Sequence, residues 1–184
     1  MYLNTVHYIK EKVFSNSFCE NIITHGDKQK TKKADIADGD SSNRKSNITW
    51  LKDEKLITQL TPIVNEANTK SNWNFLLREI EPLQYTSYHK DDYYDWHIDS
   101  HKKSYENGLI RKLSFTLFLN DDYDGGDFKI CHPHPNPDKI IIDLFKPSIG
   151  TIIIFPSHMW HKVSKVKKGT RKTLVGWVVG KPFV

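Results

Sequence analysis

Two histidines, an aspartate and an arginine are the residues of this 184-residue chain best suited to carry chemistry. His97 and Asp99 are separated by one residue, His161 follows far downstream, and Arg171 comes ten residues later. Two imidazoles and one carboxylate are the ligand set of a mononuclear iron(II) centre that keeps coordination positions open. The arginine fork can hold a carboxylate through two hydrogen bonds. Together these residues indicate an oxygenase that depends on iron(II) and 2-oxoglutarate.

The spacing of the first two ligands has a physical reason. Residues i and i+2 of a strand project to the same face, so His97 and Asp99 can chelate one ion while Ile98 points away. The third ligand must come from another strand brought alongside. His161 follows a strongly apolar run, as expected for a strand on a facing sheet. His158 is the rival third ligand, and its greater distance from Arg171 favours His161.

Composition sets the frame for these elements. At 184 residues, with 38% hydrophobic and 12% aromatic side chains, the chain is predicted to form one soluble globular domain, residues 1–184. The net charge of +5 is mostly scattered lysines, which favours solvated side chains over a nucleic-acid surface. No segment approaches the roughly 18 apolar residues of a membrane helix. With no secretory signal evident and two cysteines read as free thiols, a cytoplasmic location is expected.

The front of the chain, residues 1–72, is expected to be a helical support region. Residues 6–24 indicate a short strand and a helix opening near Ser15 or Ser17. Residues 25–47 are polar and aperiodic, which predicts a loop that could act as a lid, as could 100–110. Apolar residues at helical spacing predict an amphipathic helix over 52–68, interrupted by Pro62.

From Trp73 onward the period changes to that of strands. About nine short apolar segments separated by Gly, Pro, Asp and Asn predict an antiparallel jelly roll over residues 73–184. In the segment 111–120, Leu113, Phe115, Leu117 and Leu119 share one face, predicted to pack on the helix at 52–68. Ser114, Thr116 and Phe118 share the other, predicted to line a co-substrate pocket.

These motifs resemble the iron/2-oxoglutarate dioxygenases of the prolyl 4-hydroxylase type, especially the small PKHD hydroxylases of bacteria and phages. The resemblance covers roughly residues 73–184. The motifs that carry it are Tyr93-Tyr94-Asp95-Trp96-His97-Ile98-Asp99, Arg111-Lys112-Leu113-Ser114, Tyr123-Asp124-Gly125-Gly126-Asp127-Phe128, Phe155-Pro156-Ser157, His161-Lys162-Val163 and Gly169-Thr170-Arg171.

The resemblance implies a mainly β fold with N-terminal helices and a double-stranded β-helix core. It implies that His97, Asp99 and His161 hold iron and that Arg171 binds the distal carboxylate of 2-oxoglutarate. Tyr88 would add a hydrogen bond, with Tyr85 as its rival, and Trp177 lies near the pocket on the last strand. Phe118 stands where some relatives have a tyrosine that contacts the co-substrate.

The resulting hypothesis is hydroxylation of an unactivated C–H bond with release of succinate and CO2. The resemblance suggests a prolyl residue of a peptide or protein as target, O2 as oxidant and ascorbate as a supporting reductant. Free amino acids stay open as substrates. Two alternatives are oxidation of nucleic-acid bases, which the basic charge would suit, and a non-catalytic β-helix that binds metal or ligand.

Overall fold

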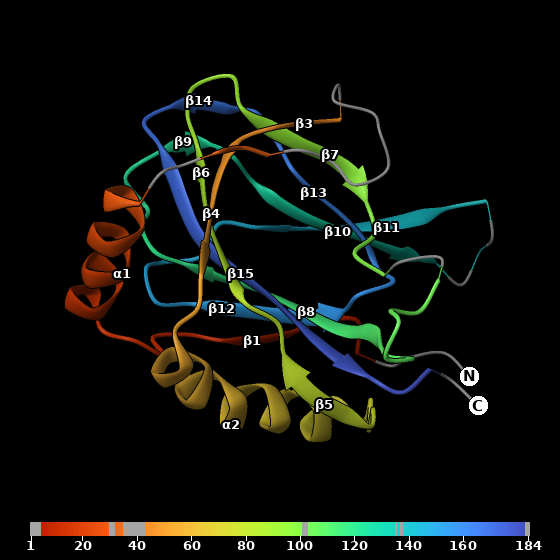
Figure 1. Ribbon diagram of the computed structural model, residues 1–184. Helices are drawn as coiled ribbons and strands as arrows, with labels where there is room; N and C mark the ends of the chain where they lie inside the picture. Colours follow the sequence, from red (N-terminus) through yellow and green to blue (C-terminus); the bar gives the residue numbers. More distant parts are fainter. Residues whose placement is uncertain are drawn as a thin grey trace.

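The computed structural model describes residues 5–29, 32–34, 43–100, 103–134, 136 and 138–182. Its architecture is a sandwich of two antiparallel sheets with helices on one outer face (Figure 1). This confirms the predicted mainly β fold class with a jelly-roll core. No helix in the described ranges is long and apolar enough to cross a membrane.

The larger sheet forms the centre of the molecule. It consists of β1 (Tyr8–Lys10), β2 (Lys32–Lys33), β4 (Asn47–Leu51), β5 (Leu77–Ile80), β6 (Leu83–Tyr88), β8 (Ile110–Phe118), β12 (Ile152–Pro156) and β15 (Arg171–Gly180). Their order is β1-β12-β8-β15-β6-β4-β2, with β5 also paired to β15. The long strand β15 therefore lies between β8 and β6, and every residue it carries toward the second sheet reaches the interior of the sandwich.

The smaller sheet packs on the inner face of the larger one. It consists of β3 (Arg44–Lys45), β7 (Tyr93–His97), β10 (Phe128–Pro133), β11 (Ile140–Phe145) and β13 (Trp160–Val163), in the order β11-β10-β13-β7-β3. A separate pair, β9 (Asp124–Gly125) and β14 (Val166–Lys168), closes one end.

Two helices cover the outer face of the larger sheet (Figure 1). Helix α1 (Asn16–Lys28) begins at the predicted serine, since the Ser15 hydroxyl accepts a hydrogen bond from the Phe18 amide. Helix α2 (Glu54–Lys70) is capped by Asp53 and runs through Pro62 without ending. Its buried residues Leu56, Leu60 and Val64 follow one another at four-residue intervals, the spacing of one helix face.

The alternation predicted for β8 is confirmed. Leu113, Phe115 and Leu117 belong to the same buried cluster as the apolar face of α2. Phe118 belongs to a second cluster between the sheets, with Phe128 and Phe155. The first cluster fixes the helices to the sheet, and the second fixes the distance between the two sheets.

The prediction of a polar loop over 25–47 is wrong for most of the residues that the structure describes there. Helix α1 continues to Lys28, β2 and β3 are short strands, and β4 begins at Asn47. The strand β4 pairs with β6, and β3 pairs with β7. Residues 30–31 and 35–42 lie outside the described ranges, as do residues 101–102 of the second segment considered as a lid.

Candidate active site

His97 and His161 are directly paired across two neighbouring strands, β7 and β13. Both strands belong to the smaller sheet, so the expectation that His161 comes from a facing sheet is wrong. Asp99 also departs from its predicted position, because β7 ends at His97 and the aspartate follows in a turn. The Asp99 amide donates to the Ser157 carbonyl over 2.9 Å, which ties the turn to the connection between β12 and β13.

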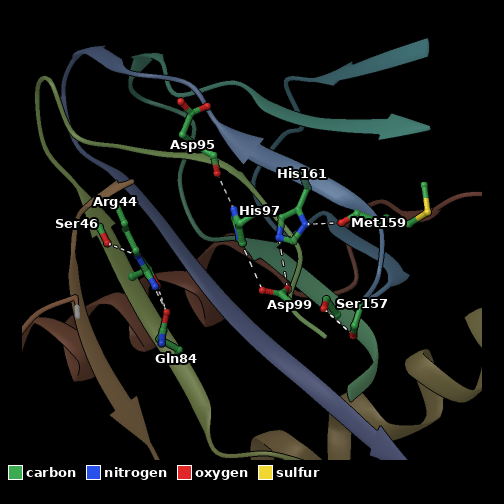
Figure 2. A network of polar contacts seen from close by, with 11 residues as sticks. Arg44, Ser46, Gln84, Asp95, His97, Asp99, Ser157, Met159 and His161 are labelled. Carbon is green, nitrogen blue, oxygen red and sulfur yellow. Dashed lines mark hydrogen bonds and ion pairs between the residues drawn. The ribbon is translucent and has the colours of Figure 1, made fainter. Parts of the chain in front are cut away.

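The three side chains converge on one point (Figure 2). Asp99 Oδ1 lies 3.7 Å from His97 Nε2, and its Oδ2 lies 3.4 Å from His161 Nε2. One ligand atom from each residue lies within 4.8 Å of the other two. This is the arrangement of donors that could hold a single metal ion.

Backbone carbonyls orient both imidazoles. His97 Nδ1 lies 2.7 Å from the Asp95 carbonyl oxygen, and His161 Nδ1 lies 2.9 Å from that of Met159. A carbonyl only accepts, so each Nδ1 carries the proton and donates, which leaves the Nε2 lone pair directed at the shared centre. Both rings are thus held in the tautomer that a metal ligand needs.

Burial and charge set the protonation states of the site. Desolvation lowers the pKa of His97 to about 3, so this imidazole is neutral at physiological pH. Burial alone would raise the pKa of Asp99, but the neighbouring His161 and His97 and a hydrogen bond from Ser114 hold it well below its usual range. The carboxylate is therefore ionised, as coordination of a cation requires.

Ser114 lies beside the aspartate instead of lining the pocket. Its hydroxyl donates to Asp99 and lies 2.9 Å from the Ser157 hydroxyl. Because a carboxylate only accepts, the proton order runs from Ser157 to Ser114 to Asp99. Ser114 thus makes a supporting contact to a candidate metal ligand, and its contact with the co-substrate stays a prediction.

Arg171 lies across the sandwich from the triad, on β15, and only 1% of it is exposed. Its Nη1 reaches the Thr173 hydroxyl at 3.4 Å, but its Nε and Nη2 have no hydrogen-bond partner among the described residues. Its guanidinium carbon lies 5.4 Å from the Tyr88 ring centroid and 5.0 Å from that of Phe118. Within the described ranges no carboxylate pairs with this buried cation.

Tyr88 and Tyr85 point to opposite faces of the larger sheet, because they lie three residues apart on β6. Tyr88 is paired with Arg171 and lines the pocket beside it. Tyr85 points to the helices, where its hydroxyl donates to Asp27 over 2.7 Å. Tyr88 is therefore the phenol near the arginine.

One pocket joins the triad to Arg171. Its lining includes the predicted Thr116 and Trp177 and three residues that sequence reasoning missed, Arg44, Gln84 and Tyr94. Arg111 covers one face of Trp177, 4.0 Å from its ring, and is itself paired with Glu81. Arg44 was missed because it lies in the segment interpreted as a loop.

Comparison with known proteins agrees with this geometry. The model of the 2OG-Fe(II) oxygenase superfamily matches residues 83–179. A PKHD-type hydroxylase of Prochlorococcus marinus is 32% identical over 187 residues, which cover 94% of this chain and 78% of that protein. A PKHD-type hydroxylase of Gloeothece citriformis is 34% identical, over 70% of this chain and 57% of that protein, so the chain spans less than two thirds of this relative. A solved prolyl-4-hydroxylase of Pseudomonas putida has the same fold, with a TM-score of 0.74 at 15% identity, covering 98% of this chain and 95% of that one.

The chain therefore belongs to the 2OG-Fe(II) oxygenase superfamily, and its relatives are PKHD-type hydroxylases. Proteins of this superfamily are dioxygenases that use iron(II), 2-oxoglutarate and O2, which confirms the predicted enzyme class and these cofactors. Ascorbate as a supporting reductant stays a prediction.

Proposed function

We propose that this chain is a single oxygenase domain that hydroxylates an unactivated C–H bond of a prolyl residue in a peptide or protein. His97, Asp99 and His161 would hold iron(II), and Arg171 would bind the distal carboxylate of 2-oxoglutarate. The observation that carries the proposal is the buried guanidinium of Arg171, whose Nε and Nη2 find no partner in the described part of the chain and which shares a pocket with the triad. A dicarboxylate anchored there can reach toward a metal held on the opposite sheet.

The side chains of the pocket suit both iron(II) and 2-oxoglutarate. Two imidazoles with their Nε2 atoms directed at the shared centre and an ionised carboxylate suit iron(II), whose ligand preference lies between soft and hard. The buried cation needs an anion, because a charge taken out of water without a partner is costly. Tyr88 and Thr116 line the same pocket and add hydroxyl groups beside that anion.

When bound, iron(II) with 2-oxoglutarate and O2 supplies the oxidising power: the co-substrate becomes succinate and CO2, and the second oxygen atom enters the product. The chain's own residues position and protect this chemistry. The carbonyls of Asp95 and Met159 fix the imidazoles, and Ser114 fixes the carboxylate. Phe128 and Phe155 pack near His161 and restrict water on that side.

The prolyl target rests on the PKHD-type relatives and on the shared fold of the prolyl-4-hydroxylase. A cytoplasmic location is part of the proposal, since a reducing compartment keeps iron ferrous and both Cys19 and Cys131 are free thiols.

The first test is an anaerobic titration with iron(II) and 2-oxoglutarate, followed by the visible charge-transfer band of the chelate. We expect the band in the wild-type protein and in His158→Ala, but not in His161→Ala. A folded wild-type protein without the band would refute the oxygenase proposal. Loss of the band in His158→Ala with retention in His161→Ala would reassign the third ligand.

A further inference from the structure

A basic groove lies next to the pocket that joins the triad to Arg171, which is called the iron pocket below. It has a volume of about 530 Å³ and is lined by residues of β2, β3 and β7, the start of β4 and the turn after β6. Its cationic side chains are Lys33, Arg44, Lys45 and Lys90. Among the described residues of the lining, the one acid is Asp92.

Asp92 offsets one of the groove cations, Lys45, and leaves the charges of Lys33, Arg44 and Lys90. The side chain is only 7% exposed; Oδ1 lies 3.2 Å from Lys45 Nζ, and Oδ2 accepts from the His89 amide over 2.9 Å. Lys33 and Lys90 are exposed and form no ion pair with the described carboxylates. The groove therefore presents positive charge to solvent.

Arg44 belongs to the groove and also to the iron pocket. Its Nε donates to Ser46 over 2.8 Å and its Nη2 donates to Gln84 over 2.9 Å (Figure 2). Both partners are neutral, so they orient the guanidinium without cancelling its charge. In the chain as described, Arg44 has no carboxylate partner.

A stack of side chains connects this cation to the metal site. The Arg44 guanidinium lies 4.6 Å from the Tyr94 ring centroid, and the His97 ring stacks on Tyr94 with 3.4 Å between the ring centroids. Arg44 and a candidate metal ligand thus contact the same aromatic ring. A group bound by Arg44 would lie close to the atom that reacts.

We infer that the groove binds an acidic stretch of the peptide substrate and that Arg44 pairs with a carboxylate next to the hydroxylated residue. The inference rests on the proposed function and specifies its substrate class. Positive charge lines the groove, Arg44 lines both the groove and the pocket, and a planar guanidinium suits a carboxylate.

The aromatic residues of this path favour a peptide over a nucleic acid. Single strands bind by stacking bases on exposed aromatic faces. Tyr94 is flanked by Arg44 and His97, and Lys165 lies 5.6 Å from the ring centroid of Tyr93. The groove therefore offers charge without an evident stacking platform.

The test compares the binding of three short fluorescein-labelled peptides by fluorescence anisotropy. All have a central proline, flanked by Asp and Glu, by Lys, or by Ser and Gly. We expect the acidic peptide to bind at least about tenfold more tightly than the lysine peptide, with a difference that shrinks as salt is added. Equal binding of the three peptides would overturn the inference, as would tighter binding of a labelled single-stranded RNA.

A matched pair of double variants locates the site. Lys33→Ser/Lys90→Ser removes two groove charges, and Lys52→Ser/Lys55→Ser removes two exposed charges elsewhere. We expect roughly three- to tenfold weaker binding of the acidic peptide in the first variant only. Equal losses in both would mean that net charge, not the groove, attracts the peptide, which contradicts the inference.

Arg44 is tested by turnover of the acidic prolyl peptide. Arg44→Gln should raise KM strongly with little change in kcat or in the charge-transfer band, and Arg44→Lys should restore part of the loss. Hydroxylation of all three peptides with equal KM would refute the acidic-substrate inference and leave the proposed function standing. Binding of the acidic peptide through the groove without hydroxylation would support the inference and count against prolyl hydroxylation.

Discussion

Gly126 and Arg171 are in such close contact that a side chain on the glycine would displace the arginine. A Cβ at Gly126 would lie 2.9 Å from Arg171 Cδ, and the glycine has a φ of +61°. The side chain of Arg171, which is proposed to bind 2-oxoglutarate, is therefore positioned by contact with the backbone of Gly126.

Gly126→Ala should weaken 2-oxoglutarate binding although residue 126 does not touch the co-substrate. We expect at least a tenfold rise in the 2-oxoglutarate concentration needed for the charge-transfer band, because small misplacements of a binding group are costly. Gly108→Ala is the control: its φ is +76°, and a Cβ there meets nothing within 4 Å. The positive φ should cost each variant about 1 kcal/mol of stability, and Gly126→Ala should lose more because of its close contacts. An equal effect of the two variants on co-substrate binding would argue against the contact with Arg171.

Arg171→Met should separate stability from co-substrate binding. Burying the cation without an anion is costly, so the ligand-free variant should be more stable than the wild type by about 1–4 kcal/mol in chemical denaturation. With anaerobic iron(II) present throughout, 2-oxoglutarate at 100 times its Kd should stabilise the wild type by about a further 2.7 kcal/mol and add nothing to the stability of the variant. A variant that is still stabilised by 2-oxoglutarate would show that the carboxylate binds elsewhere.

Ser114→Ala should weaken iron(II) binding about 10- to 100-fold, because it removes the hydroxyl that donates to Asp99. Anaerobic isothermal titration calorimetry measures the change. Ser157→Ala should cost less, since the Ser114 donor to the carboxylate remains. The supporting role of Ser114 would be disproved by unchanged iron affinity in a folded Ser114→Ala protein.

Glu66 should make the stability of the folded protein depend on pH in the acidic range. Hydrogen bonds from Lys10, Lys70 and Tyr8 lower the pKa of Glu66 to about 2, and they tie β1 to α2. A carboxyl whose pKa is lower in the folded state stabilises above its unfolded pKa, and this stabilisation is lost as pH falls through its folded pKa. The Tm difference between wild type and Glu66→Gln should therefore be full at neutral pH and shrink between pH 4.5 and about 2. Glu79→Gln, an exposed control without an ion pair among the described residues, should show no such trend.

The sequence predicted the chemistry of the site better than its placement. Strand alternation in β8 was confirmed because it depends only on local geometry. The position of Asp99 was wrong because the chain leaves β7 after His97, and the sheet of His161 was wrong because strand order is set by distant pairing. The same parity rule could have separated Tyr88 from Tyr85, since residues three apart in a strand face opposite sides.

The short front strands could not be predicted for a related reason. The segments β2 and β3 consist of Lys-Lys and Arg-Lys, which carry no strand periodicity. They become strands because β4 and β7 offer unpaired edges, a property of the folded sheets and not of the segments themselves. Arg44 was missed with them.

The two halves of the site stand on different sheets, His97 and His161 on the smaller one, and Arg171, Tyr88 and Thr116 on the larger one. The distance that the co-substrate would have to bridge is therefore set by the spacing of the two sheets. The aromatic side chains of Phe118, Phe128 and Phe155, which pack between the sheets, determine this spacing. Trimming these side chains, as in Phe128→Leu, would bring the sheets closer and shorten the gap between metal and anchor. We therefore expect the packing of the aromatic core to determine the length of dicarboxylate that can connect the metal with Arg171.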